Sequence, residues 1–129
     1  MIDDYLALIP AAGVGARAQL STAKQFLKIG EKTILEHAID PFIKDENCKK
    51  ICVVTNEEDD LWPSLGISDH EKITSCFGGS TRMNSVLAGL ELLIDLEDKS
   101  SLVAIHDAAR PCLQIEDLKT LMEYADEEI

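Results

Sequence analysis

The sequence predicts a single α/β domain, over residues 1–129, built on a mainly parallel β-sheet. Short apolar segments alternate along the chain with segments of helical periodicity, in the order strand–helix throughout. The strand candidates are apolar on both faces, which is typical of a parallel sheet covered by helices on both sides. Right-handed crossovers would connect such strands, and 129 residues suit one compact domain.

The first strand is expected over residues 5–10, an apolar run that ends at small residues. A long loop with at most one helical turn follows over residues 11–24. Thr33 and Glu36 have the spacing of a capping box and predict the start of a helix. Pro41 lies inside that helix and is expected to kink or interrupt it. Its apolar face would consist of positions 34, 35, 38, 39, 42 and 43.

The middle of the chain predicts two more strands and a second long helix. The strands cover residues 50–55 and 73–77, with a short helix or loop over residues 57–66 between them. Either Ser80 or Thr81 can cap the following helix, which extends to about residue 95. Its inward face is expected to be continuous and apolar: Met83, Val86, Leu87, Leu90, Leu93 and Ile94.

The last elements are a strand over residues 101–106, a loop over residues 107–111 and a helix over residues 115–127. The residues of this helix expected to face inward are Leu118, Leu121, Met122 and Ala125.

Composition excludes several classes of protein. Acidic residues outnumber basic ones 24 to 12, and a net charge of −12 opposes non-specific nucleic-acid binding. The chain has neither the basic start of a signal peptide nor an apolar run of roughly 18 residues, so we expect a cytoplasmic protein outside the membrane. No two cysteines have C-x-x-C spacing, and we expect reduced thiols in or near the core: Cys48, Cys52, Cys76 and Cys112.

Three loops follow strands and should meet at one edge of the sheet, where ligands bind in open α/β folds. The first, residues 10–24, contains two glycines, Arg17 and Lys24. Small residues allow close approach of the backbone to phosphate, and the two cations could neutralise it. The same stretch fits the weak dinucleotide pattern G-x-G-x-x-A, and it also fits a plain glycine turn with surface cations.

The second loop, residues 78–85, joins a strand to a helix N-terminus, which favours anionic or polar ligands. Gly79 could present its backbone to a base or ribose. Ordinary capping with a solvated Arg82 is the competing interpretation of this loop.

The third loop, residues 106–111, places Asp107 directly after a strand. Mg²⁺ prefers a carboxylate together with substrate phosphates, so Asp107 is a candidate metal ligand. Arg110 could meet a second phosphate-bearing substrate, and an Asp–Arg surface pair is the competing interpretation. We expect His106 to be structural.

Together the motifs PAAGVGAR…KQFL, GGSTRMNSV and HDAARP resemble the 2-C-methyl-D-erythritol 4-phosphate cytidylyltransferases of the non-mevalonate isoprenoid pathway. The resemblance implies a three-layer, Rossmann-like nucleotide-diphospho-sugar transferase fold and transfer of CMP from CTP to a sugar-alcohol phosphate. It also implies Mg²⁺ as cofactor and a homodimer for the full-length protein. Arg17 and Lys24 would be catalytic, Asp107 would bind the metal, and Arg110 would lie on the acceptor side. The implied nucleotide-binding residues are Pro10, Ala11, Ala12, Gly13, Gly15, Gly79, Ser85, Asp107 and Ala108.

Family members continue past the length of this chain, so the resemblance implies an N-terminal portion that lacks most of the acceptor half. We expect this portion by itself to bind CTP weakly and to have little turnover. Two alternatives stay open. One is a cytidylyltransferase for ribitol 5-phosphate or another sugar phosphate, and the other is a nucleotide-binding module without turnover.

Overall fold

The computed structural model describes residues 4–12, 24–57, 61–96, 102–108 and 112–128. Within them four strands form one sheet in the order β5-β4-β1-β6, and each neighbouring pair is parallel. The strands are β1 (Tyr5–Pro10), β4 (Cys48–Thr55), β5 (Ile73–Phe77) and β6 (Leu102–Ile105). The predicted α/β class with a parallel sheet is therefore confirmed.

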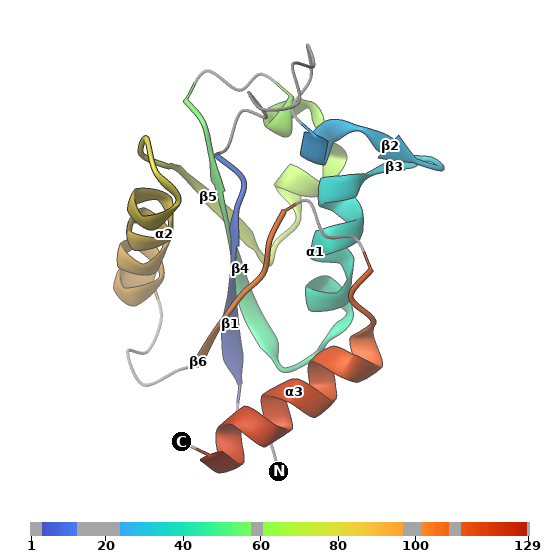
Figure 1. Cartoon of the computed structure of the whole chain (residues 1–129), viewed down its shortest axis with the longest axis vertical. Helices are drawn as coiled ribbons and strands as arrows, with labels where there is room; N and C mark the ends of the chain where they lie inside the picture. Colours follow the sequence, from blue (N-terminus) through green and yellow to red (C-terminus); the bar gives the residue numbers. More distant parts are fainter. Residues whose placement is uncertain (1–3, 13–23, 58–60, 97–101, 109–111, 129) are drawn as a thin grey trace.

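The sheet lies between two helical layers (Figure 1). Helix α2 (Arg82–Leu96) covers one face, while α1 (Ile34–Lys44) and α3 (Ile115–Glu128) lie on the other. The apolar residues form two clusters, one on each side of the sheet. Strand β1 supplies residues to both clusters and is almost fully buried, which explains why its sequence is apolar without alternation.

Helix α1 begins where the sequence predicted. Thr33 is the N-cap: its hydroxyl accepts from the Glu36 N–H at 3.1 Å, and its own N–H donates to Glu36 Oε1 at 3.0 Å. The expectation that Pro41 interrupts the helix is wrong, because α1 continues to Lys44 and the Asp45 N–H donates to the Pro41 carbonyl. The capping box and the buried apolar face, which includes Pro41 itself, outweigh the one hydrogen bond that proline removes.

Several short elements were not predicted in detail. Strands β2 (Lys28–Ile29) and β3 (Lys32–Thr33) form a small antiparallel hairpin, in which Gly30 has a φ of 70°. Glycine adopts this left-handed conformation without the steric cost of a side chain. The remaining short elements among the described residues are three 3-10 helices: η2 (Lys24–Phe26), η3 (Trp62–Ser64) and η4 (Gly66–Asp69).

The predicted inward face of α2 is wrong at several positions. Gly89 lies against the sheet, where an added Cβ would be 2.5 Å from Leu8 Cδ1 and 2.9 Å from Val54 Cγ2. Leu93 is buried with it, but Met83 is 80% exposed. Leu87 and Ile94 are also exposed, as is Leu121 of α3. Helical spacing identified an apolar stripe, but the stripe is wider than the contact that one sheet face provides.

The cysteines partly follow the prediction. Cys48 and Cys52 are buried and Cys76 is half-buried, whereas Cys112 is exposed rather than near the core. All four are free thiols. Among the described residues, no helix combines the length and the apolar character that a membrane crossing needs.

Candidate functional site

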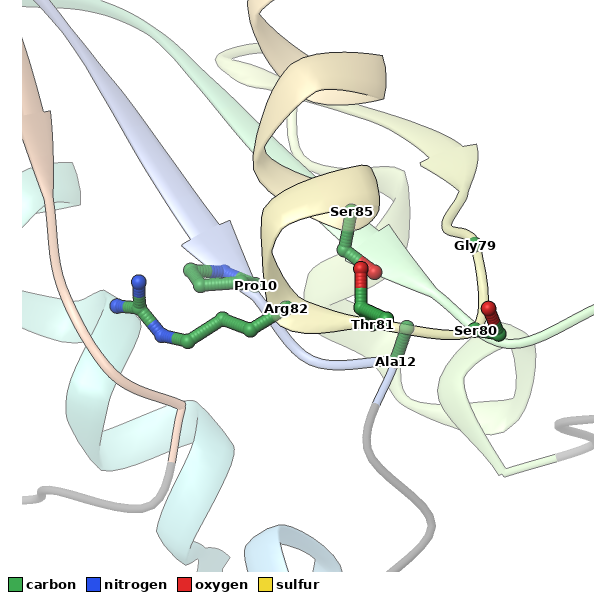
Figure 2. A pocket seen from close by; sticks show the side chains of 7 residues that line it. All are labelled: Pro10, Ala12, Gly79, Ser80, Thr81, Arg82 and Ser85. Atoms are coloured by element: carbon green, nitrogen blue, oxygen red, sulfur yellow. The ribbon is translucent and has the colours of Figure 1, made fainter.

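A pocket of about 240 Å³ lies at the end of β1 and the start of α2 (Figure 2). It is formed by the end of the first strand and by the second predicted loop, segments about 70 positions apart in the sequence. Parallel strands bring these ends together because all of them finish at the same edge of the sheet. The lining residues are Pro10, Ala12, Gly79, Ser80, Thr81, Arg82 and Ser85.

The two ends of the first loop are held close to each other. The Ala11 N–H donates to the Val54 carbonyl at 2.7 Å, which continues the sheet contact beyond β1. The buried side chain of Gln25 donates from Nε2 to the Ala11 carbonyl at 2.9 Å. Gln25 follows Lys24 in η2, so this hydrogen bond fixes the backbone of Lys24 next to the start of the glycine-rich loop.

The two glycines of the second loop are required by close packing. A Cβ on Gly78 would fall against the Ser85 hydroxyl and 2.8 Å from the Ala12 methyl group. A Cβ on Gly79 would be 2.5 Å from that of Asn84. These contacts join the first loop, the second loop and the first turns of α2, and Ser85 is buried at their centre. The pocket therefore has a tightly packed wall at this side.

The N-terminal end of α2 gives the pocket its polar character. Thr81 caps the helix, because its hydroxyl accepts from the Asn84 N–H at 3.0 Å. The hydroxyls of Ser80, Thr81 and Ser85 lie around the start of the helix (Figure 2). The positive end of a 15-residue helix dipole favours anionic groups at such a place. Arg82 adds a formal positive charge, so the pocket suits an anionic, polar ligand even though the chain is acidic overall.

The third loop reaches this pocket through Arg82. Arg82 Nη2 donates a hydrogen bond to Asp107 Oδ1 at 2.9 Å, and the two side chains also form an ion pair. Asp107 follows β6, whose neighbour in the sheet is β1. The competing interpretation of this loop is therefore half right: Thr81 caps the helix, but the exposed Arg82 side chain is paired with Asp107 rather than only solvated.

The two residues on either side of Asp107, His106 and Ala108, make contacts with the sheet and the core. The Ala108 side chain is buried in the core, so a ligand could meet its backbone but not its methyl group. The His106 N–H donates to the Leu8 carbonyl at 3.1 Å, and its ring centroid lies 5.8 Å from that of Phe42. These contacts favour the structural role expected for His106.

The structure brings together some of the predicted site residues. Pro10, Ala12, Gly79 and Ser85 line the pocket, and Ala11 is buried beside it. Gly13, Gly15, Arg17 and Arg110 lie outside the described residues, as does the side chain of Lys24.

Three lining residues were missed as site residues: Ser80, Thr81 and Arg82. Their position between a glycine pair and a long helix was a usable signal, since a helix N-terminus after a strand is a common anion site. The partner of Arg82 gave no such signal, because Asp107 is 25 positions away.

A divalent cation could be held here only together with phosphate groups. Among the described residues, no cluster of three or more His, Cys, Asp or Glu side chains could form a metal site by itself. Mg²⁺ is commonly bound by one or two carboxylates, with substrate phosphates and water completing its coordination. Asp107, a single carboxylate beside a pocket suited to anions, fits that pattern.

Comparisons with known proteins agree on one family. Residues 5–129 match the family model described as 2-C-methyl-D-erythritol 4-phosphate cytidylyltransferase. A protein of that name from Actinobacillus pleuropneumoniae serotype 5b is 42% identical over 99% of this chain and 54% of its own length. The chain thus spans about half the length of the curated relatives that it matches.

Solved structures give the same result. A crystal structure of 4-diphosphocytidyl-2C-methyl-D-erythritol synthase is 32% identical, with a TM-score of 0.80 over 97% of this chain and 55% of that one. The 2-C-methyl-D-erythritol 4-phosphate cytidylyltransferase of Francisella tularensis is 36% identical, with a TM-score of 0.74 over 95% of this chain and 52% of that one.

Proposed function

The chain belongs to the 2-C-methyl-D-erythritol 4-phosphate cytidylyltransferase family, and from this premise we propose that it forms the nucleotide-binding part of such an enzyme. The reaction would transfer CMP from CTP to 2-C-methyl-D-erythritol 4-phosphate and release pyrophosphate. The observation that carries the proposal is the pocket in which the first and second loops, both matched by the family model, meet at the start of α2.

The pocket suits the parts of a nucleotide in different ways. We assign the base and ribose to the side of Gly79 and Ser85, where the tight packing limits the size of the ligand. We assign the triphosphate to the first loop, with Arg17 and Lys24 as the neutralising cations. The Gln25–Ala11 hydrogen bond supports this assignment, because it keeps the backbone of Lys24 at that loop.

The proposed reaction needs alignment and charge neutralisation rather than a covalent intermediate. An oxygen of the acceptor phosphate forms a bond to the α-phosphorus of CTP, and the bond from that phosphorus to the bridging oxygen of pyrophosphate breaks. The attacking phosphate is already ionised, so no strong general base is required. Cations and backbone N–H groups that hold both phosphates in line are then the main source of rate acceleration.

Further parts of the proposal come from the family resemblance. Asp107 would hold Mg²⁺ together with the nucleotide phosphates, and the metal would neutralise charge that develops on them. Arg110 would contact the acceptor phosphate. For the whole protein we propose a cytoplasmic homodimer.

The experiment that tests the function compares Lys24→Ala with Lys28→Ala, since Lys28 is a nearby exposed lysine outside the pocket. Both variants are made in the whole protein, of which this chain would be the nucleotide-binding part. Pyrophosphate release is measured with CTP and either 2-C-methyl-D-erythritol 4-phosphate or ribitol 5-phosphate, and CTP affinity is measured by calorimetry. We expect Lys24→Ala to reduce turnover far more than affinity, and Lys28→Ala to change neither.

Other outcomes would identify the alternatives. Turnover with ribitol 5-phosphate but not with 2-C-methyl-D-erythritol 4-phosphate would identify ribitol 5-phosphate as the acceptor. CTP binding without turnover on either acceptor would indicate a non-catalytic module. Thermal shifts with the four nucleoside triphosphates and Mg²⁺ test the base: stabilisation by another triphosphate, and not by CTP, would contradict the proposal.

A further inference from the structure

We propose that Arg82 is a positioning residue, which holds the Asp107 carboxylate at the rim of the pocket so that it can bind a divalent cation carried by the nucleotide phosphates. The inference rests on the proposed function, and it assigns a role to a residue that sequence motifs left as a solvated surface cation. Its basis is the contact between Arg82 Nη2 and Asp107 Oδ1 at 2.9 Å.

The contact adds a polar link between α2 and the segment after β6, a strand that already shares the apolar cluster containing Leu93 and Val103 with α2. Arg82 is the first residue of α2, the helix that packs over β1, β4 and β5. Asp107 follows β6, at the other edge of the sheet. The Arg82 side chain extends from the first turn of α2 away from Gly79 and Ser80 (Figure 2). It therefore spans the distance between the pocket and the third loop.

Folding stability does not explain the pair. The side chains of Arg82 and Asp107 are 63% and 42% exposed, and ion pairs at that exposure contribute little to stability. A lysine would supply the same charge. The planar guanidinium restricts the direction of the carboxylate that it binds, and this restriction is what a metal-binding carboxylate needs from its supporting residue.

The charge of Arg82 also matters for an anionic ligand. The chain carries 24 acidic residues against 12 basic ones, and a carboxylate next to a triphosphate repels it unless a cation compensates. The guanidinium in contact with Asp107 supplies that compensation until a divalent cation arrives with the phosphates. Arg82 thus acts on the nucleotide through Asp107.

The test measures CTP binding by calorimetry on the 129-residue chain over a range of Mg²⁺ concentrations and also without divalent cation. The variants are Arg82→Met, Arg82→Lys, Asp107→Asn and the double variant Arg82→Met/Asp107→Asn. Lys49→Met is the matched control, because it removes another exposed ion pair, Lys49–Asp4 at 3.6 Å, from a different part of the surface. Circular dichroism verifies the fold of each variant, and Arg82→Lys keeps the test valid if the methionine variant unfolds.

We expect Arg82→Met to raise the Mg²⁺ concentration that half-saturates CTP binding by about tenfold, the usual effect of losing a residue that supports a metal ligand. Asp107→Asn should do at least the same, and the double variant should be no worse than Asp107→Asn alone, because the two residues act as one unit. Without divalent cation, Arg82→Met should weaken CTP binding by a smaller factor than it does with Mg²⁺, and Asp107→Asn should not weaken it, because it removes the repelling carboxylate. Arg82→Lys should recover part of the loss.

Two results would overturn the positioning role while leaving the proposed function intact. The first is an equal loss of CTP affinity with and without Mg²⁺ in Arg82→Met, which would make Arg82 a direct nucleotide ligand. The second is additive effects of the two substitutions. If the unaltered chain binds no CTP at any Mg²⁺ concentration, the proposed function fails and the positioning role fails with it.

Discussion

The phenol of Tyr5 donates a hydrogen bond to Asp45 Oδ2 at 2.7 Å, and both residues are buried, with exposures of 1% and 0%. Tyr5 begins β1 and Asp45 is the C-cap of α1, so the bond joins a strand of the sheet interior to a helix that covers it. The Asn47 N–H donates to the other carboxylate oxygen at 3.1 Å. A buried carboxylate is tolerated here because its oxygens have donors.

Tyr5→Phe should destabilise the protein by about 1–3 kcal/mol, because it removes a donor from a buried carboxylate without changing the shape of the core. The free energy of unfolding is measured by denaturant titration. Tyr124→Phe is the control, since Tyr124 is exposed, and it should change stability by less than about 0.5 kcal/mol. Equal stability of the two variants would mean that the Tyr5 hydrogen bond contributes nothing.

Stability should fall as the pH rises above about 9. Burial raises the pKa of the Cys48 thiol to about 12, from an ordinary value of 9.0. Burial and then the hydrogen bond to Asp45 raise the pKa of Tyr5. The unfolded chain therefore loses these protons first, and each group lowers the free energy of unfolding by up to about 1.4 kcal/mol per pH unit.

This pH dependence is measured by denaturant titration between pH 7 and 11. Cys48→Ala should make the decline shallower between pH 9 and the pKa of about 12 that the folded protein gives this thiol, whereas Cys112→Ala, which alters an exposed thiol, should leave the slope unchanged. A stability that is constant from pH 8 to 11 would contradict the burial of these groups.

Gly89→Ala should destabilise the protein by about 1–3 kcal/mol, although alanine is the better helix former. The added methyl group would be 2.5 Å from Leu8 Cδ1, and the sheet cannot yield there without moving β1. Gly66→Ala is the matched control, because an added Cβ at Gly66 meets nothing within 4 Å. A melting temperature that rises in both variants would show that α2 can shift away from the sheet.

Thr81→Ala should cost about 1 kcal/mol of stability, because Thr81 is the residue whose hydroxyl caps α2. The sequence allowed either Ser80 or Thr81 in this role, so Ser80→Ala is the natural comparison and should cost clearly less. Thermal unfolding of the two single variants decides between them, and a larger loss in Ser80→Ala would reverse the assignment.

Gly78→Ala should reduce CTP affinity by at least about tenfold, or about 1.4 kcal/mol. The methyl group would collide with the Ser85 hydroxyl and with Ala12, both of which line the pocket. Calorimetry with CTP and Mg²⁺ measures the effect, with Gly66→Ala as the control of unchanged affinity. Wild-type affinity in a folded Gly78→Ala protein would place the nucleotide elsewhere.

The sequence by itself determined the elements whose signals are local. The bounds of β1 follow from a short apolar run that ends at small residues, and β5 ends where the sequence places the Gly78-Gly79 pair. The start of α1 follows from the spacing of Thr33 and Glu36. These signals are local, because the apolar run of a strand and the capping box of a helix each involve residues only a few positions apart in the sequence. The same reasoning placed Gly79 and Ser85 at the edge of the sheet where the pocket lies.

The tertiary structure alone decided what depends on distant neighbours. Helical spacing could not separate the buried Leu93 from the exposed Met83, since the difference lies in where the sheet meets α2. It could not pair Arg82 with Asp107 either, because that contact requires the strand order β5-β4-β1-β6. Strand order is set by how all the apolar faces are buried together, a property of the whole chain that no short segment contains.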